Sequence, residues 1–233
     1  MQREQLLSAV FDSADHPLKD AITEWLMLSR RFEAFVDAHL AKIRKKLRTN
    51  THPDTVGDLR LELETAFLLL RSDALHLTYE PEHRQHGRST DFAVRYTTSV
   101  TFMTEVTRLR PQTTALRNER FTSMLHDKLG QLQPQHGNLI LVGIETQQPT
   151  ADELRKLALQ AKQQIDRGDA EFVQRYGFTS RSALVKQYQR LSAVLIREIP
   201  LQAHEPVAIW VNPEAKYPLP AKVLTALASS HRL

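Results

Sequence analysis

The chain has 233 residues, of which 41% are hydrophobic, so it can bury a substantial core as one large domain or as one domain with an appendage. Its 31 lysines and arginines exceed its 27 aspartates and glutamates, and the resulting charge of +4 permits an anionic partner such as nucleic acid without requiring one. The absence of cysteine excludes disulfide frameworks and thiolate zinc sites and favours the reducing cytoplasm, and the apolar runs are too short to span a membrane.

The first segment is predicted to be helical. Apolar residues recur at helical spacing from about Pro17 to Leu47 without an internal proline or glycine, which predicts one long helix or two. Five positive charges lie between Lys42 and Arg48, just before a break at Asn50 to Pro53. They fit either a solvated helix end that complements the helix dipole or a patch that contacts phosphates. We interpret residues 1–55 as a helical N-terminal extension that offers a surface for a homodimer.

The remaining residues, 56–233, are predicted to form one α/β domain, because they contain no repeat, low-complexity tract or long linker. The predicted elements are a helix at 56–71, strands at 75–79, 91–96 and 99–109, a helix at 114–132, a strand at 138–144, helices at 151–167, 170–176 and 180–190, strands at 193–197 and 207–211, and a helix at 220–229. The strand at 138–144 is almost continuously apolar, which is typical of a central strand covered on both faces.

Three acidic residues stand out in the first half of this domain. Glu62 lies at the edge of the apolar stripe of the first helix, and the helical spacing places Glu64 further into solvent. Asp91 opens the second strand, and Glu105 lies in the third. Carboxylates contributed by separate elements in this order are suited to gathering a divalent cation.

Each of these carboxylates also has an ordinary structural interpretation. Glu62 fits a solvated helix edge or a partner for a nearby arginine, and Asp91 fits a turn residue that starts a strand. Glu105 fits a salt bridge to Arg108 or Arg110. Glu105 is the hardest to leave unexplained, because a carboxylate among apolar neighbours must either pair or bind a cation.

The motifs around these residues carry a resemblance. Thr90-Asp91-Phe92 opens the second strand and Thr104-Glu105-Val106-Thr107 lies in the third, within the order helix, three strands, helix, strand. Over about residues 59–144 this arrangement resembles the PD-(D/E)xK nuclease superfamily. The resemblance implies a restriction-endonuclease-like αβββαβ core around a mixed central sheet, with metal-dependent hydrolysis of phosphodiester bonds in nucleic acid.

The resemblance also implies a set of site residues. In the family, the acidic residues of the central hairpin hold the metal, so Asp91, Glu105 and the main-chain carbonyl of Val106 would be ligands of Mg²⁺ or Mn²⁺. Glu62 would match the acidic residue that the first helix often contributes, with Glu64 as the second choice. Glu80 and Glu82 lie at the end of a neighbouring strand, and one of them would reach the cation through water.

Two positions depart from the family motif. Thr90 stands where the motif has proline, and Thr107 stands where it has lysine. A neutral hydroxyl cannot supply positive charge to a phosphate in its transition state, and strand alternation sends Arg108 to the opposite face. Members of the superfamily sometimes move the lysine to another element, which makes Lys128 the candidate here, and Gln131 resembles a polar helix residue that some members add beside it.

The loop after the first strand and several basic residues add weaker signals. His83 and His86 have the spacing of a metal pair but no obvious third ligand. The candidate phosphate contacts are Arg84, Arg88, Arg108, Arg110, Arg117, Arg120 and the residues near Lys45. The aromatic residues Trp25, Trp210, Phe178 and Tyr188 lie in apolar-periodic segments and are predicted to be core residues.

Two functions from different classes therefore remain open. The first is a metal-dependent endonuclease or exonuclease that uses Glu62, Asp91, Glu105 and Lys128. The second is a catalytically degenerate nuclease-fold protein that acts as a nucleic-acid-binding or protein-interaction module. Thr107 favours the second function, whereas three buried and mutually repelling carboxylates in one order favour the first.

Overall fold

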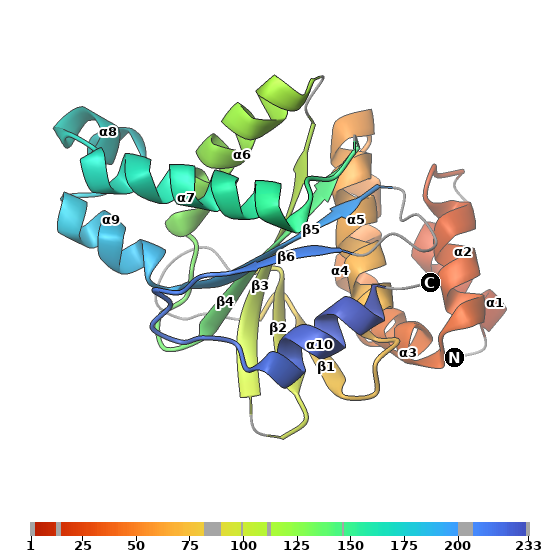
Figure 1. Cartoon of the computed structure of the whole chain (residues 1–233). Coiled ribbons are helices and arrows are strands. Elements are labelled where there is room, and N and C mark those ends of the chain that lie inside the picture. The colour runs from red at the N-terminus through yellow and green to blue at the C-terminus, as the bar shows by residue number, and fades with distance from the viewer. Residues whose placement is uncertain are drawn as a thin grey trace.

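The computed structural model describes residues 3–12, 15–81, 90–98, 100–110, 113–145, 147–199 and 207–231. Within these ranges, six strands form one sheet in the order β1-β2-β3-β4-β5-β6 (Figure 1). The pairs β1–β2, β2–β3 and β5–β6 are antiparallel, and the pairs β3–β4 and β4–β5 are parallel. The sheet is therefore mixed, and the predicted α/β class is confirmed.

The strands and the later helices lie within a few residues of their predicted positions. The strands are β1 Leu75–Tyr79, β2 Phe92–Tyr96, β3 Val100–Leu109, β4 Gly137–Ile144, β5 Leu191–Glu198 and β6 Ala208–Val211. The helices after the N-terminal segment are α5 Pro53–Leu69, α6 Thr114–Leu129, α7 Ala151–Arg167, α8 Ala170–Arg175, α9 Arg181–Tyr188 and α10 Ala221–Ser230. The elements α5, β1, β2, β3, α6 and β4 follow one another in the predicted order of helix, three strands, helix and strand.

Helices cover both faces of the sheet (Figure 1). The N-terminal helices, α5 and α10 bury apolar side chains against one face, and α6, α7, α8 and α9 bury theirs against the other. Every residue of β4 is buried, as expected for a central strand covered on both sides. Trp25, Trp210 and Tyr188 are buried and Phe178 packs on the core, so the prediction that these rings are core residues is confirmed. In the described ranges, no helix combines the length and apolar character needed to cross a bilayer.

The N-terminal segment contains more helices than predicted. They are α1 Arg3–Phe11, α2 Lys19–Leu28, α3 Arg30–Ala38 and α4 Leu40–Thr49. The prediction of one or two helices between Pro17 and Leu47 is wrong, because the chain breaks twice there. Ser29 has an extended backbone, and its hydroxyl accepts a hydrogen bond from the N–H of Phe32 to begin α3. His39 leaves the helical conformation between α3 and α4.

The N-terminal helices pack directly on α5. The rings of Trp25 and Phe32 each lie 5.7 Å, centroid to centroid, from the ring of Phe67 in α5. Their side chains belong to the same hydrophobic core as the residues of the sheet that face α5. Residues 1–55 therefore help to cover the sheet, in addition to any surface that they offer to a partner.

Because α5 lies between the N-terminal helices and the sheet, it has little solvent face. The expectation that Glu64 points into solvent is wrong, since the residue is only 6% exposed. Its Oε2 accepts a hydrogen bond from Nη2 of Arg197 at 2.7 Å, and Arg197 is fully buried in β5. A buried carboxylate needs such a partner, and this pairing commits Glu64 to the core rather than to a metal site.

Candidate active site

The carboxylates of Asp91 and Glu105 meet where β2 and β3 pair. The antiparallel register places Phe92 opposite Thr104, so the preceding residue, Asp91, lies opposite Glu105 and on the same face of the sheet. Asp91 Oδ2 accepts a hydrogen bond from the N–H of Val106 at 2.7 Å, which fixes the orientation of the carboxylate. Burial, with repulsion from Glu105 as the next cause, raises the pKa of Asp91 to about 6.

Lys128 of α6 brings a positive charge to this pair. Its Nζ lies 3.3 Å from Oε2 of Glu105 and donates a hydrogen bond to Oε1 of Gln131 at 3.0 Å. The carboxylate of Glu105 is almost completely buried, whereas Lys128 is partly exposed. The ammonium group of Lys128 thus lies beside Glu105. Thr107, two residues after Glu105 in β3, is the position at which the family motif has lysine.

Glu62 approaches the cluster from α5 and has a different lysine partner. Lys46 Nζ lies 2.6 Å from Oε1 of Glu62 and 2.6 Å from Oε1 of Glu80. Burial raises the pKa of Glu62 most strongly; Lys46 opposes this effect, and the charge of Asp91 adds to it. Burial alone would lower the pKa of Lys46, but Glu62 and Glu80 outweigh that effect and raise it. The charge of Asp91 therefore interacts unfavourably with both Glu62 and Glu105.

Tyr79 and Glu80 close the cluster at the end of β1. The centroid of the Tyr79 ring lies 4.9 Å from Lys46 Nζ, and the buried hydroxyl of Tyr79 approaches the carboxylate of Glu62. Burial, followed by the nearby charge of Glu62, raises the pKa of Tyr79, so the phenol remains protonated. Glu80 adopts a φ of 42° and turns its carboxylate toward Lys42 and Lys46. Tyr79 and Glu80 therefore belong to the same charged cluster as Glu62 and Lys46.

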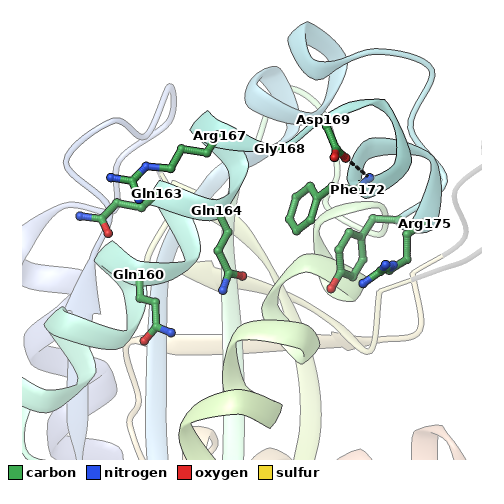
Figure 2. A pocket seen from close by; sticks show the side chains of 9 residues that line it. Gln160, Gln163, Gln164, Arg167, Gly168, Asp169, Phe172 and Arg175 are labelled. Carbon is green, nitrogen blue, oxygen red and sulfur yellow. Dashed lines mark hydrogen bonds between the residues drawn. The ribbon is translucent and has the colours of Figure 1, made fainter.

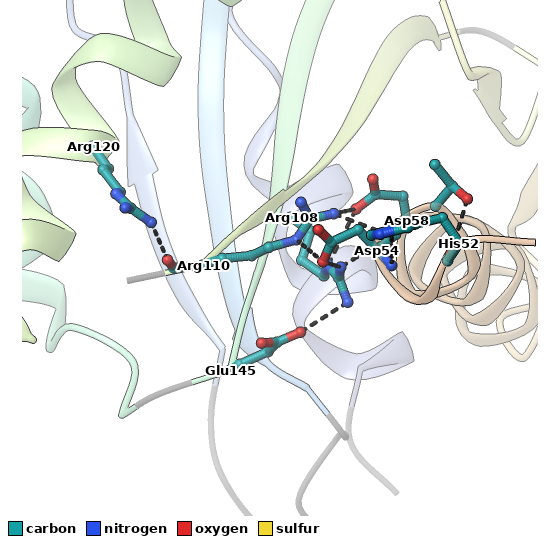
Figure 3. Close-up of polar contacts among 8 residues, drawn as sticks. His52, Asp54, Asp58, Arg108, Arg110, Arg120 and Glu145 are labelled. Atoms are coloured by element: carbon teal, nitrogen blue, oxygen red, sulfur yellow. Dashed lines mark hydrogen bonds and ion pairs between the residues drawn. The ribbon is translucent and has the colours of Figure 1, made fainter. Parts of the chain in front are cut away.

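The arginines near the end of β3 form a separate network (Figure 3). Arg108 lies 3.1 Å from Asp54, 3.1 Å from Asp58 and 2.8 Å from Glu145, and Arg110 lies 2.6 Å from Asp58. This network accounts for the two arginines that the sequence offered as salt-bridge partners of Glu105. Two further predicted phosphate contacts also have partners within the chain: Arg117 is buried and donates to the carbonyl of Gln147, and Arg120 donates to the carbonyl of Arg110.

We refer to Glu62, Asp91 and Glu105, with Lys46, Lys128, Tyr79 and Glu80 around them, as the carboxylate–lysine cluster. A small cavity lies between this cluster and the arginine network. Its volume is about 280 Å³, and its lining residues are Asp58, Leu61, Val106, Thr107, Arg108, Arg110 and Lys128. Thr107, which the resemblance aligns with the motif lysine, lines this cavity from β3. Lys128, the candidate replacement for that lysine, lines it from α6. The cavity is large enough to admit several water molecules or a phosphate group.

The predicted catalytic residues and direct metal ligands all lie in the described part of the chain. The contacts above bring together Asp91, Val106, Glu105, Lys128 and Gln131, and they place Glu62 on the α5 side of the same cluster. No protein-family model, curated protein sequence or solved structure matches this chain. The geometry of the cluster is therefore the basis for assigning a function.

The donor atoms of Asp91 and Glu105 fit a hard divalent cation. Among the described residues, no group of three or more histidine, aspartate or glutamate side chains is arranged to hold a metal ion. Mg²⁺ commonly uses only one or two carboxylates and completes its shell with water and substrate oxygens. Within the described ranges, Asp91 uses only Oδ2, in its bond to Val106, and Oε2 of Glu105 faces Lys128. The role of Glu62 as a third ligand stays a prediction.

Two members of the cluster were not predicted from the sequence. Lys46 belongs to the basic run at the end of α4, which we interpreted as a solvated helix end or a phosphate-binding patch, whereas its ammonium group compensates two carboxylates. Tyr79 gave no signal beyond the apolar pattern of its strand. The predictions for Glu82, His83, Arg84, His86 and Arg88 lie outside the described residues.

Proposed function

We propose that this protein is a metal-dependent nuclease built on a restriction-endonuclease-like core. Asp91, Glu105 and the main-chain carbonyl of Val106 would hold Mg²⁺ or Mn²⁺, and Lys128 would take the role of the missing motif lysine. The observation that carries the proposal is the placement of Lys128 Nζ 3.3 Å from Glu105, in a chain whose motif position holds Thr107. The neighbouring Gln131, which accepts a hydrogen bond from Lys128, fits the same role.

The residues of the cluster supply what phosphodiester hydrolysis needs. A bound divalent ion would neutralise charge on the scissile phosphate and make a water molecule easier to ionise near neutral pH. The N–H of Val106 keeps Asp91 oriented, and Glu105 keeps Lys128 close to the cavity that a phosphate would enter. Once a cation compensates Glu105, the ammonium of Lys128 is free to stabilise negative charge that develops on the phosphate.

A second function is favoured by the same lysines. Glu105 pairs with Lys128, and Glu62 pairs with Lys46, so these two carboxylates are already compensated without a cation. In that case the cluster would be a structural ion-pair site, and the protein would bind nucleic acid or another protein without turnover. The two functions differ in whether Lys128 and a metal ion compete for Glu105.

Lys128→Ala distinguishes these functions. For the nuclease, we expect wild-type protein to bind Mn²⁺ with roughly millimolar affinity or better and to cleave DNA or RNA in its presence. Lys128→Ala should keep or strengthen Mn²⁺ binding, because a competing charge is removed, yet reduce the cleavage rate by roughly 100- to 1,000-fold. Glu105→Ala should abolish both. Isothermal titration calorimetry and single-turnover cleavage assays measure the two effects.

The matched control is Lys162→Ala. Lys162 is a lysine whose side chain is mostly covered, like that of Lys128, and it pairs with Asp166 and Glu214 away from the cluster. Its replacement should leave both Mn²⁺ affinity and cleavage unchanged. If wild-type protein and Glu105→Ala take up Mn²⁺ equally poorly while both remain folded, the nuclease proposal is wrong and the module remains.

A further inference from the structure

A second polar site lies between α7 and α8, outside the carboxylate–lysine cluster (Figure 2). The cavity has a volume of about 590 Å³, within the range of about 300 to 1,000 Å³ that is typical of small-ligand sites. Its lining residues are Gln160, Gln163, Gln164, Arg167, Gly168, Asp169, Phe172, Arg175 and Tyr176. We refer to it as the α7–α8 groove.

One wall of the groove is a row of polar side chains on α7. Gln160, Gln163, Gln164 and Arg167 follow the spacing i, i+3, i+4 and i+7, which places them on one face of the helix. Within the described residues, none of the four has a hydrogen-bond or ion-pair partner, and Figure 2 shows them along the α7 side of the groove. Three amides and one guanidinium group thus present unused donors and acceptors along the α7 side of the groove.

The opposite wall is aromatic and firmly supported. The rings of Phe172 and Tyr176 lie 5.1 Å apart in an edge-to-face arrangement. Both also contact the buried imidazole of His126 in α6, at centroid distances of 5.1 and 4.9 Å. Gly168 makes room for this wall, since a Cβ atom there would lie 2.5 Å from Cδ1 of Phe172. The rings are therefore held in place without a bound ligand.

The charges of the groove favour an anion. Arg167 and Arg175 lie at its rim, and the exposed pair of Arg175 with Glu171 holds its guanidinium only weakly. The carboxylate of Asp169 accepts a hydrogen bond from the N–H of Phe172 at 2.8 Å and so caps α8. The lining therefore carries two guanidinium groups, one on the α7 side and one on the α8 side, and a single carboxylate that is already engaged.

We propose that the α7–α8 groove binds nucleotide units, with a base against Phe172 and Tyr176 and phosphates at the two rim arginines, Arg167 on the α7 side and Arg175 on the α8 side. Amide side chains pair well with the donor and acceptor edges of bases, arginine binds phosphate bidentately, and aromatic rings accept unstacked bases. A base is accessible in this way in a free nucleotide or in a single strand, but not inside a duplex.

The groove is separate from the carboxylate–lysine cluster, although α6 touches both. His126 of α6 supports the aromatic wall, and Lys128, two residues later, points to Glu105 on another side of the helix. The inference deepens the proposed function, because a strand held here would make single-stranded nucleic acid the substrate. It is tested by binding without metal, so that the groove and the nuclease proposal can fail independently.

The experiment uses the full chain in EDTA and a short single-stranded oligonucleotide that contains 2-aminopurine. Anisotropy measures binding, and quenching of 2-aminopurine reports stacking of the base on a ring. Arg167→Ala should weaken binding by roughly tenfold while quenching at saturation persists. Tyr176→Leu, which keeps apolar bulk, should weaken binding by roughly tenfold and reduce the quenching. Arg155→Ala removes the same charge from another part of α7 and should change neither.

Adenosine monophosphate distinguishes the two sources of the nucleotide. If it displaces the oligonucleotide and its own binding requires Arg167, a free nucleotide is the ligand. If only the oligonucleotide binds, with both variant effects as above, the ligand is a single strand. The inference is overturned if neither molecule binds in EDTA, if binding occurs without quenching, or if Arg155→Ala and Arg167→Ala weaken binding equally.

Discussion

The carboxylate–lysine cluster and the arginine network at the end of β3 solve the same electrostatic problem in different ways. In the arginine network, Asp54 and Asp58 are 53% and 51% exposed at their side chains, and the planar guanidinium of Arg108 holds both. In the cluster, the Glu105 side chain is 6% exposed and has a flexible ammonium group beside it. Solvated carboxylates held by a planar guanidinium suit a structural ion-pair network. Under the proposed function, buried carboxylates that still repel each other would exchange the lysine for a cation.

The largest effect on stability should come from replacing Asp91, and it tests this difference directly. Asp91→Asn keeps an acceptor for the N–H of Val106 and removes the charge that burial and Glu105 disfavour. We expect the metal-free protein to gain about 2 kcal/mol at pH 8, because the pKa of Asp91 lies near 6 and the charged form is strained there. Chemical denaturation in EDTA measures the gain.

The matched control for this change is Asp54→Asn. It removes an exposed partner of Arg108 and should cost up to about 1 kcal/mol. Added Mn²⁺ should stabilise the wild type and Asp54→Asn, but not Asp91→Asn. If both substitutions destabilise the metal-free protein, the contrast between the two regions does not hold.

A third charged region contains the fully buried Arg197 and, near it, the buried imidazole of His231. Burial, with the charge of Arg197 as the next cause, lowers the pKa of His231 from 6.5 to about 3. The unfolded chain therefore takes up a proton below about pH 6.5 that the folded protein refuses. This group's contribution to stability is complete above that pH and is lost progressively as the pH falls toward 3.

Between pH 7 and pH 5, this single group should reduce the free energy of unfolding by about 2 kcal/mol. His231→Gln should lower stability at pH 7 but flatten its decline toward pH 5 by that amount. The difference between the two denaturation series isolates His231, because other titrating groups such as His126 are common to both proteins. Parallel pH dependence in the two series would contradict the assignment.

The smallest expected effect concerns the packing of the arginine network on α5. A Cβ atom on Gly57 would lie 1.8 Å from Nη1 of Arg108, so alanine there must displace a guanidinium held by three carboxylates. Alanine also favours a helix interior over glycine by about 1 kcal/mol. We expect Gly57→Ala to be more favourable by about 1 kcal/mol in an Arg108→Ala background than in the wild type. A double-mutant cycle measures this coupling, and additive effects would show that Arg108 moves aside without cost.

The sequence predicted the sheet better than the site, and individual residues show why. The strands β1 and β4 carry strong local patterns, and their positions depend on little else. The breaks at Ser29 and His39 were not predicted because the apolar spacing continues through them. Ser29 caps α3, but a serine within a helical pattern does not by itself show that one helix ends and another begins there.

The partners in the site could not be read from local patterns. Lys46 meets Glu62 only because α4 and α5 fold back on each other around the turn at Pro53. Arg197 meets Glu64 across a separation of 133 residues. The pairing of Lys128 with Glu105 was suggested by the resemblance to a family rather than by the spacing of the two residues. Such contacts depend on how helices dock, which periodicity does not encode.

The position of Lys128 on α6 rather than on β3 has a consequence for assembly. The β2–β3 hairpin alone would bring Asp91 and Glu105 together, but the ammonium group arrives only when α6 docks on the sheet. A partly folded chain, or one in which α6 is dislodged, would therefore hold both acidic groups and still lack the positive charge. Under the proposed function, such a chain could capture a cation but would cleave only slowly, so efficient hydrolysis would be limited to molecules that had completed folding.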